Sequence, residues 1–235
     1  MKILVIGGMH GNEPLGINLV EKIKASKIPN VDAVTANNMA LIANKRFTTQ
    51  DLNRSFPGDI TSSEYELNRA AELTLLCNRY DVVLDFHNTY CPGNDCSFIG
   101  ENANQQLLDV SSFLDLNRII IADYDCINKY ALNCISVEIS MNSTLNDVET
   151  WYQKIINLSQ QALLPKQSSI ERYKFVYRMT LEDRDTYTLA NQGLVTFEPI
   201  RPQLARKMGL DTPAYPIFIN DTFTPYNYGA LLNKL

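Results

Sequence analysis

Short apolar runs alternate with amphipathic segments through the first two thirds of the chain. The segment "KILVIGG" at residues 2–8 is such a run, because its Ile, Leu and Val residues are continuous and two glycines close it. After Pro14, apolar residues recur at helical spacing in "LGINLVEKIKAS". Runs of the first kind predict strands at residues 2–7, 31–36, 81–86, 96–100, 117–122 and 134–139.

Two longer segments carry the period of an α-helix. Apolar residues repeat every three to four positions in "SSEYELNRAAELTLLCNRY" and in "LNDVETWYQKIINLSQQALL". Trp151 lies on the apolar stripe of the second segment, so we expect it to pack in the core rather than against a ligand. The alternation of strands and helices predicts an α/β fold, with helices flanking a mostly parallel or mixed central sheet.

The pattern changes after residue 164. The segment "PKQSS" is a polar break, and "RYKFVYRMT", "GLVTFEP" and "AYPIFIN" then read as strands separated by Pro, Gly and Asp. We therefore predict a catalytic domain over residues 1–167 and a small β-rich C-terminal domain over residues 168–235.

Composition narrows the possible partners and the compartment. The chain has 21 basic and 26 acidic residues among 235 and no basic run, which argues against nucleic acid as a partner. No segment approaches the ~18–20 apolar residues of a membrane span or resembles a secretory leader, so a soluble cytoplasmic protein is expected. The five cysteines lack the paired spacing of a zinc ribbon and are expected to be reduced thiols, although Cys91 and Cys96 could form a metal or redox pair.

The only two histidines, His10 and His87, each follow a predicted strand. Glu13 stands one helical turn after His10, so the two side chains can converge on one ion, and His87 can join them from the same edge of the sheet. Two His and one Glu form a known ligand set of catalytic zinc. Asp85 shares a strand face with His87 and could orient its imidazole. The alternative is that both histidines are ordinary polar residues at strand ends.

Further candidates lie in a loop and in a strand. Arg46, Asn53 and Arg54 fall within the polar stretch "NKRFTTQDLNRSFPG", and the planar guanidinium matches a carboxylate, so an acidic substrate is expected. Surface ion pairing is the alternative for these arginines. Glu138 interrupts the apolar strand "CISVEIS", where a buried carboxylate needs a partner such as a metal-bound water.

Four motifs together resemble one family. "GGMHGNE", "DLNRSFPG", "DFHNT" and "SVEIS" occur in the order found in the aspartoacylase and succinylglutamate desuccinylase family, whose fold is similar to that of zinc carboxypeptidases. The motifs span residues 7–140. The resemblance implies a mixed central sheet flanked by helices and a zinc-dependent hydrolase that cleaves the amide bond of an N-acyl amino acid. It also implies one Zn²⁺ per chain, an acidic small-molecule substrate and a possible homo-oligomer.

The resemblance also implies a role for each matching residue. His10, Glu13 and His87 would be the zinc ligands, and Glu138 would be the general base that takes a proton from the activated water. The substrate would be positioned by Arg46 at the scissile carbonyl and by Asn53 and Arg54 at the carboxylate.

Two substrate contacts of the family have weaker counterparts here. Aspartoacylases carry a further arginine about ten residues before the catalytic glutamate, whereas "DYDCINKYALNCISVE" offers only Lys129 for a second carboxylate. A tyrosine from the C-terminal domain matches Tyr228 in "TPYNYGALL", where Tyr226 is the neighbouring alternative. Two other readings stay open: a zinc carboxypeptidase or amidase acting on small peptides such as cell-wall fragments, and a catalytically silent binding module.

Overall fold

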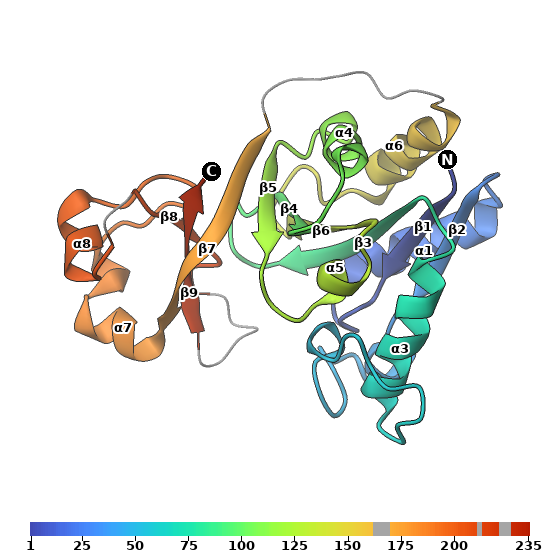
Figure 1. Ribbon diagram of the computed structural model, residues 1–235, viewed down its shortest axis with the longest axis horizontal. Helices are drawn as coiled ribbons and strands as arrows, with labels where there is room; N and C mark the ends of the chain where they lie inside the picture. Colours follow the sequence, from blue (N-terminus) through green and yellow to red (C-terminus); the bar gives the residue numbers. More distant parts are fainter. Residues whose placement is uncertain (162–169, 211–212, 221–226) are drawn as a thin grey trace.

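The computed structural model describes residues 1–161, 170–210, 213–220 and 227–235. Within these residues, nine strands form one sheet in the order β2-β1-β3-β6-β4-β5-β7-β9-β8 (Figure 1). The strands are β1 (Ile3–Gly7), β2 (Val31–Thr35), β3 (Val82–Thr89), β4 (Cys96–Gly100), β5 (Arg118–Ala122), β6 (Cys134–Ser140), β7 (Glu171–Thr180), β8 (Tyr215–Ile217) and β9 (Asn227–Lys234).

The sheet is mixed, as predicted. β1 pairs in parallel with β2 and β3, β3 with β6, β4 with β5, and β5 with β7. β4 runs antiparallel to β6, and β9 runs antiparallel to β7 and β8. Each of the six strands predicted before residue 140 has a counterpart. β3 extends to Thr89, however, so His87 lies within the strand and not after it.

Helices cover both faces of the N-terminal part of the sheet. In β1, Ile3 and Val5 face α1 (Pro14–Ser26), α4 (Gln105–Phe113) and α6 (Val148–Gln160), whereas Leu4 and Ile6 face α3 (Tyr65–Cys77) and α5 (Ile127–Tyr130). Trp151 is fully buried in the first layer, which confirms its predicted packing role. The short helices α2 (Asn38–Ala43) and η1 (Leu52–Arg54) lie in the connection between β2 and α3.

A glycine pair brings α1 into direct contact with the strands. A Cβ atom on Gly7 would lie 2.0 Å from the carbonyl oxygen of Gly16, and one on Gly16 would lie 2.8 Å from the carbonyl oxygen of Phe86. No larger residue fits at either position without displacing backbone. The start of α1, and with it Glu13, is thereby held against the end of β3.

The sheet continues into the C-terminal part of the chain, because β7 pairs with β5. The elements α7 (Leu181–Thr186), η2 (Leu189–Asn191) and α8 (Pro202–Lys207) pack on β7 and β9 (Figure 1). The strand predicted at "GLVTFEP" is wrong: this segment forms turns, and Phe197 has a positive φ of 61° that places its ring against Tyr173. The proposed domain boundary between residues 167 and 168 lies outside the described residues.

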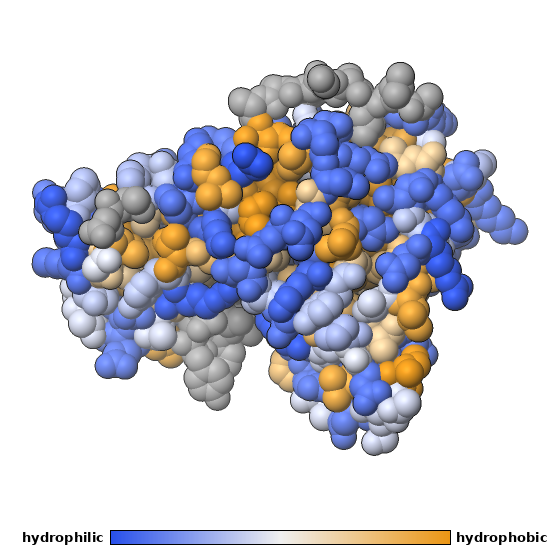
Figure 2. Space-filling model, in the orientation of Figure 1, coloured by the Kyte–Doolittle hydropathy of each residue, from blue (hydrophilic) through white to orange (hydrophobic). Residues whose placement is uncertain are grey.

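The surface has the mixed character of a folded domain. On the face shown in Figure 2, hydrophilic side chains predominate and separate smaller hydrophobic patches. Among the described residues, no helix has the length and apolar character needed to cross a membrane. All five cysteines are buried free thiols.

Candidate metal centre and active site

Most of the predicted site residues meet in one pocket of about 120 Å³, close to the carboxyl ends of β1 and β3. In an α/β sheet this edge is where ligands usually bind. The predicted residues that line the pocket are His10, Glu13, Arg46, Asn53, Arg54, His87 and Glu138.

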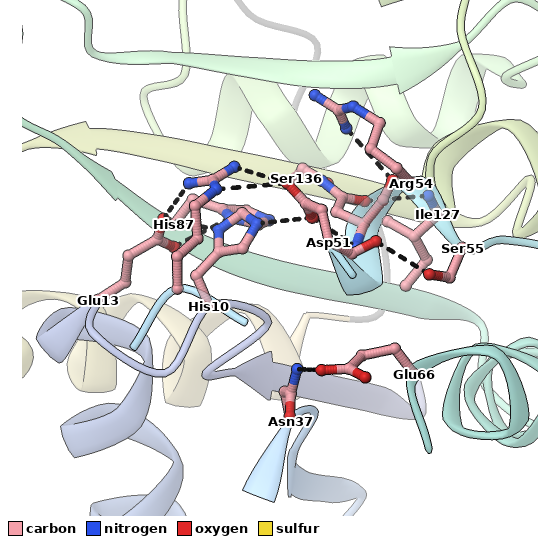
Figure 3. Close-up of polar contacts among 12 residues, drawn as sticks. His10, Glu13, Asn37, Asp51, Arg54, Ser55, Glu66, His87, Ile127 and Ser136 are labelled. Atoms are coloured by element: carbon pink, nitrogen blue, oxygen red, sulfur yellow. Dashed lines mark hydrogen bonds and ion pairs between the residues drawn. The ribbon is translucent and has the colours of Figure 1, made fainter. Parts of the chain in front are cut away.

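The two histidines and Glu13 form a compact buried group. Ligand atoms of the three residues all lie within 4.8 Å of one another. Nδ1 of His10 is 2.7 Å from one carboxylate oxygen of Glu13, and Nδ1 of His87 is 3.1 Å from the other (Figure 3). Both imidazoles thus direct the same nitrogen toward one carboxylate, an arrangement that could hold a metal ion.

A second carboxylate contacts the remaining nitrogen of each imidazole. Nε2 of His87 lies 2.7 Å from Asp85, as predicted from the strand spacing. Nε2 of His10 lies 3.1 Å from Asp51 (Figure 3). Such partners fix the ring orientation and favour a lone pair on Nδ1. The role of Asp51 was missed, although it is the first residue of the motif "DLNRSFPG" and therefore lay within a quoted signal.

The charges of this group suit a cation. Burial alone would lower the pKa of both imidazoles. The nearby carboxylates outweigh burial and raise both pKa values: Glu13 and Asp51 act on His10, and Asp85 and Glu13 act on His87. The pKa of Glu13 is held well below its usual range by the two imidazoles, despite burial. Three carboxylates therefore surround two imidazoles in a nearly solvent-free site, and a bound dication would balance that excess of negative charge.

The start of α1 positions the Glu13 carboxylate. Glu13 is the residue before the first helical turn, and Pro14 follows it at a position where a missing N–H costs nothing. The N–H of Leu15 donates to the side chain of Asn88 on β3 at 2.9 Å. Because Asn88 caps the helix, the side chain of Glu13 can turn toward the histidines. Asn88 follows His87 directly in "DFHNT" and was not singled out from the sequence.

Glu138 faces the same pocket from β6. It is the register partner of His87 on the neighbouring parallel strand. Burial raises the pKa of Glu138 to about 7, against the lowering effect of His87. A carboxyl group with a pKa near neutrality can both accept and return a proton, which is what general acid–base chemistry requires.

The loop between α2 and α3 supplies the cationic residues. Arg46 lies 3.1 Å from Asp51 and 3.4 Å from Glu13, next to the candidate metal ligands. Asn53 and Arg54 lie on η1, and Oδ1 of Asn53 accepts a hydrogen bond from the backbone N–H of Ile127. The three predicted substrate contacts therefore line one pocket with the candidate metal ligands.

A buried glutamate fixes the backbone just after Arg46. Glu66 of α3 is fully buried, and its carboxylate accepts hydrogen bonds from the backbone N–H groups of Thr48 and Thr49. The side chain of Asn37 also donates to this carboxylate (Figure 3). These bonds hold its pKa below the usual range despite burial. No pattern in the sequence indicated this role, because Glu66 reads as one of several charged residues on a helix.

Lys129 and Tyr228 are not among the residues that line this pocket. The Lys129 ammonium group is half-exposed and pairs with Asp125 at 2.7 Å, one helical turn earlier. Tyr228 is buried in the cluster between β7, β9 and α8. Tyr226 lies outside the described residues. The pocket wall opposite the histidines instead contains five residues that the sequence did not single out: Phe98, Tyr124, Phe175, Arg178 and Phe218.

Comparison with known proteins agrees with this fold and identifies its family. The model of the succinylglutamate desuccinylase/aspartoacylase catalytic domain matches residues 1–129, more than half of the chain. The chain therefore belongs to this family.

Two relatives cover different shares of the chain. The N-acyl-aromatic-L-amino acid amidohydrolase of Rattus norvegicus is 31% identical over an alignment of 138 positions, which covers 49% of this chain and 42% of that protein. The chain thus matches less than half of that relative's length. A probable aspartoacylase of Nostoc sp. is 26% identical over an alignment of 270 positions, which covers 94% of this chain and 91% of that protein.

Solved structures confirm the predicted fold class. The crystal structure of murine aminoacylase 3 superposes with a TM-score of 0.73 at 21% identity, covering 100% of this chain and 95% of that one. A succinylglutamate desuccinylase from Chromobacterium violaceum gives a TM-score of 0.72 at 17% identity, covering 99% and 84%. At these identities the similarity concerns the fold.

Proposed function

We propose that this protein is a zinc-dependent hydrolase that cleaves the amide bond of an N-acyl amino acid. The observation that carries the proposal is the convergence of two histidines, two glutamates and the Arg46–Arg54 loop on one pocket. The names of the relatives, which are amidohydrolases of N-acyl amino acids or aspartoacylases, support the same reaction class.

His10 and His87 would each hold the metal through Nδ1, and Glu13 would hold it through a carboxylate oxygen. Zinc bound there would supply a Lewis acid that polarises the scissile carbonyl and lowers the pKa of water. Asp51 and Asp85 would keep both imidazoles oriented from behind.

The loop residues would bind and orient the substrate. Arg54 and Asn53 would hold the carboxylate of the amino acid, since a guanidinium fork and an amide N–H₂ both donate to carboxylate oxygens. Arg46 would donate to the oxygen of the scissile carbonyl and stabilise the negative charge that develops on it. Glu66 would keep Arg46 in place through the backbone of Thr48 and Thr49.

Glu138 would move the proton. Its carboxylate would accept a proton from the water whose oxygen bonds to the carbonyl carbon, and would then donate it to the nitrogen as the C–N bond breaks. The products are a carboxylate and a free amino acid, so atoms balance without any further reactant.

The test is hydrolysis by the zinc-loaded protein of N-acyl amino acids and short peptides, with chelated protein as control. We expect release of the free amino acid from at least one N-acyl amino acid and loss of activity on chelation. Turnover of peptides alone would support the carboxypeptidase alternative. Stoichiometric zinc binding without turnover of any substrate would overturn the hydrolase and indicate a binding module.

A further inference from the structure

The wall of the pocket opposite the histidines is aromatic and comes from separate parts of the chain. Phe98 of β4 stacks with Phe175 of β7 and with Phe218, which follows β8, at ring-centre distances of 6.2 Å in both pairs. Tyr124, which follows β5, meets Phe175 edge-on at 6.0 Å. The wall is therefore rigid, because its rings pack on one another.

One cation is built into this wall. The guanidinium carbon of Arg178 lies 4.5 Å from the ring centre of Phe175 and 5.0 Å from that of Tyr124. Cation–π contacts with two rings restrain the position of the guanidinium group without consuming its N–H donors. Arg178 lines the pocket together with both rings.

Tyr124 links Arg178 to the proposed site of the amino-acid carboxylate. The guanidinium carbon of Arg54 lies 4.6 Å from the centre of the same ring. Because each guanidinium carbon is no more than 5.0 Å from the ring centre, the two cations are separated by at most twice that distance. A small molecule with two carboxylate groups can span such a gap.

The present partner of Arg178 is weakly held. Nη2 lies 3.6 Å from Asp123, which is longer than a hydrogen bond, and the two side chains are 48% and 32% exposed. A surface pair of this kind contributes little. A carboxylate entering the pocket could replace it with two hydrogen bonds to the guanidinium fork.

We propose that Arg178 determines specificity by binding a second carboxylate of the substrate, in the role predicted for Lys129. The inference rests on the proposed hydrolase function and narrows its substrate to N-acyl dicarboxylic compounds. Among the described residues that line the pocket, the other cationic side chains are Arg46, Arg54 and the two histidines. Arg46 lies against Asp51 and Glu13, and Arg54 is assigned to the first carboxylate.

Two matched substrate pairs locate the second carboxylate. N-acetylaspartate and N-acetylasparagine differ only by a charge on the side chain. N-succinylalanine and N-butanoylalanine differ by a carboxylate on the acyl group. We expect the wild-type protein to prefer the charged member of one pair by about 10-fold in kcat/KM, because only the carboxylate can accept charge-assisted hydrogen bonds from the guanidinium group.

Substitutions then assign that preference to a residue. In Arg178→Met the preference should fall to within a few fold of unity, through a rise in KM for the charged substrate. Arg178→Lys should keep part of it, because lysine retains the charge but loses the fork. Arg172→Met, an exposed position on the same strand, removes the same charge and should leave the ratio unchanged.

A binding measurement separates this inference from the hydrolase proposal. Calorimetry with the zinc-loaded Glu138→Gln variant compares Kd values for both members of each pair, with and without Arg178→Met, whether or not the protein turns them over. A charge preference that Arg178→Met abolishes supports the inference even if no substrate is hydrolysed.

Equal binding of charged and neutral members would overturn the inference, as would a preference that survives Arg178→Met. Tighter binding of N-acetylphenylalanine than of every diacid would also overturn it, and would assign the wall to an aromatic side chain.

Discussion

The two sides of the pocket differ in how they are made. On the side of the candidate metal ligands (the metal side), His10 with Glu13, and Asp85 with His87, lie within three residues of one another in sequence and form short polar contacts in a buried site. On the opposite wall, Phe98, Tyr124, Phe175 and Phe218 come from four separate segments and contact one another through their rings. The groups on the metal side thus lie in pairs close together in sequence, whereas the proposed specificity wall depends on how distant strands pack.

The largest effect is expected at the proton-transfer position. Glu138→Gln preserves shape but cannot accept a proton, so kcat should fall between about 10²- and 10⁴-fold. Zinc content, measured by atomic emission, should stay near one per chain, because Glu138 is not among the candidate ligands. Wild-type turnover by a zinc-loaded Glu138→Gln protein would remove Glu138 from the mechanism.

The metal side was predictable because strand ends and their spacing are visible in the sequence. A buried strand that stops at glycines, followed by His and Glu three apart, allows few geometries, and the alternation along β3 places Asp85 and His87 on one face. The helix caps and loop supports were less visible. Asn88 and Glu66 act through backbone groups of other segments, which no local spacing reveals.

The next-largest effect, on zinc affinity, is expected at Asp51, which contacts His10 but is not itself a candidate metal ligand. Asp51→Asn keeps a side chain of the same size near His10 but removes the carboxylate, so zinc affinity should weaken by about 10- to 100-fold. Competition with a chromogenic chelator measures this change. Asp59→Asn, an exposed position nearby, is the matched control. Equal affinities in both variants would show that Asp51 does not orient His10.

The aromatic wall of the pocket could not be predicted from the sequence, and the reason is physical. Phe175 and Arg178 reach the pocket only because β7 joins the sheet beside β5, which follows from strand pairing and not from the residues themselves. The strand predicted at residues 193–199 also failed here, since Phe197 turns back to pack on Tyr173. The other two strands predicted in this part of the chain are present as β7 and β8, so the local pattern identifies strands but not which of their residues reach the pocket.

A smaller effect concerns stability in the absence of metal. Because the pKa of Glu138 is about 7 in the folded protein and 4.5 for an ordinary glutamate, the folded state binds more protons between these values. Stability from this group therefore falls as pH rises from 4.5 to about 7. Glu138→Gln should raise the free energy of unfolding of chelated protein by about 1–2 kcal/mol at pH 8.

Urea unfolding at several pH values measures that difference. The gain should shrink as pH falls toward 4.5, where the wild-type carboxyl is protonated in the folded state. A gain of equal size at pH 8 and pH 5 would mean that the substitution acts through packing and not through the carboxylate charge.

The smallest effect is expected at Lys129, and it tests whether Lys129 or Arg178 binds the second carboxylate of the substrate. Lys129→Met should change kcat/KM for any charged substrate by less than about twofold, because an exposed ion pair is worth little. The ammonium group faces Asp125, whose carboxylate also accepts from Tyr130, so its charge is already engaged outside the pocket. A tenfold loss specific to the charged member of a substrate pair would instead require Lys129 to turn inward on substrate binding. In that case Lys129, and not Arg178, would bind the second carboxylate, as the family resemblance had suggested.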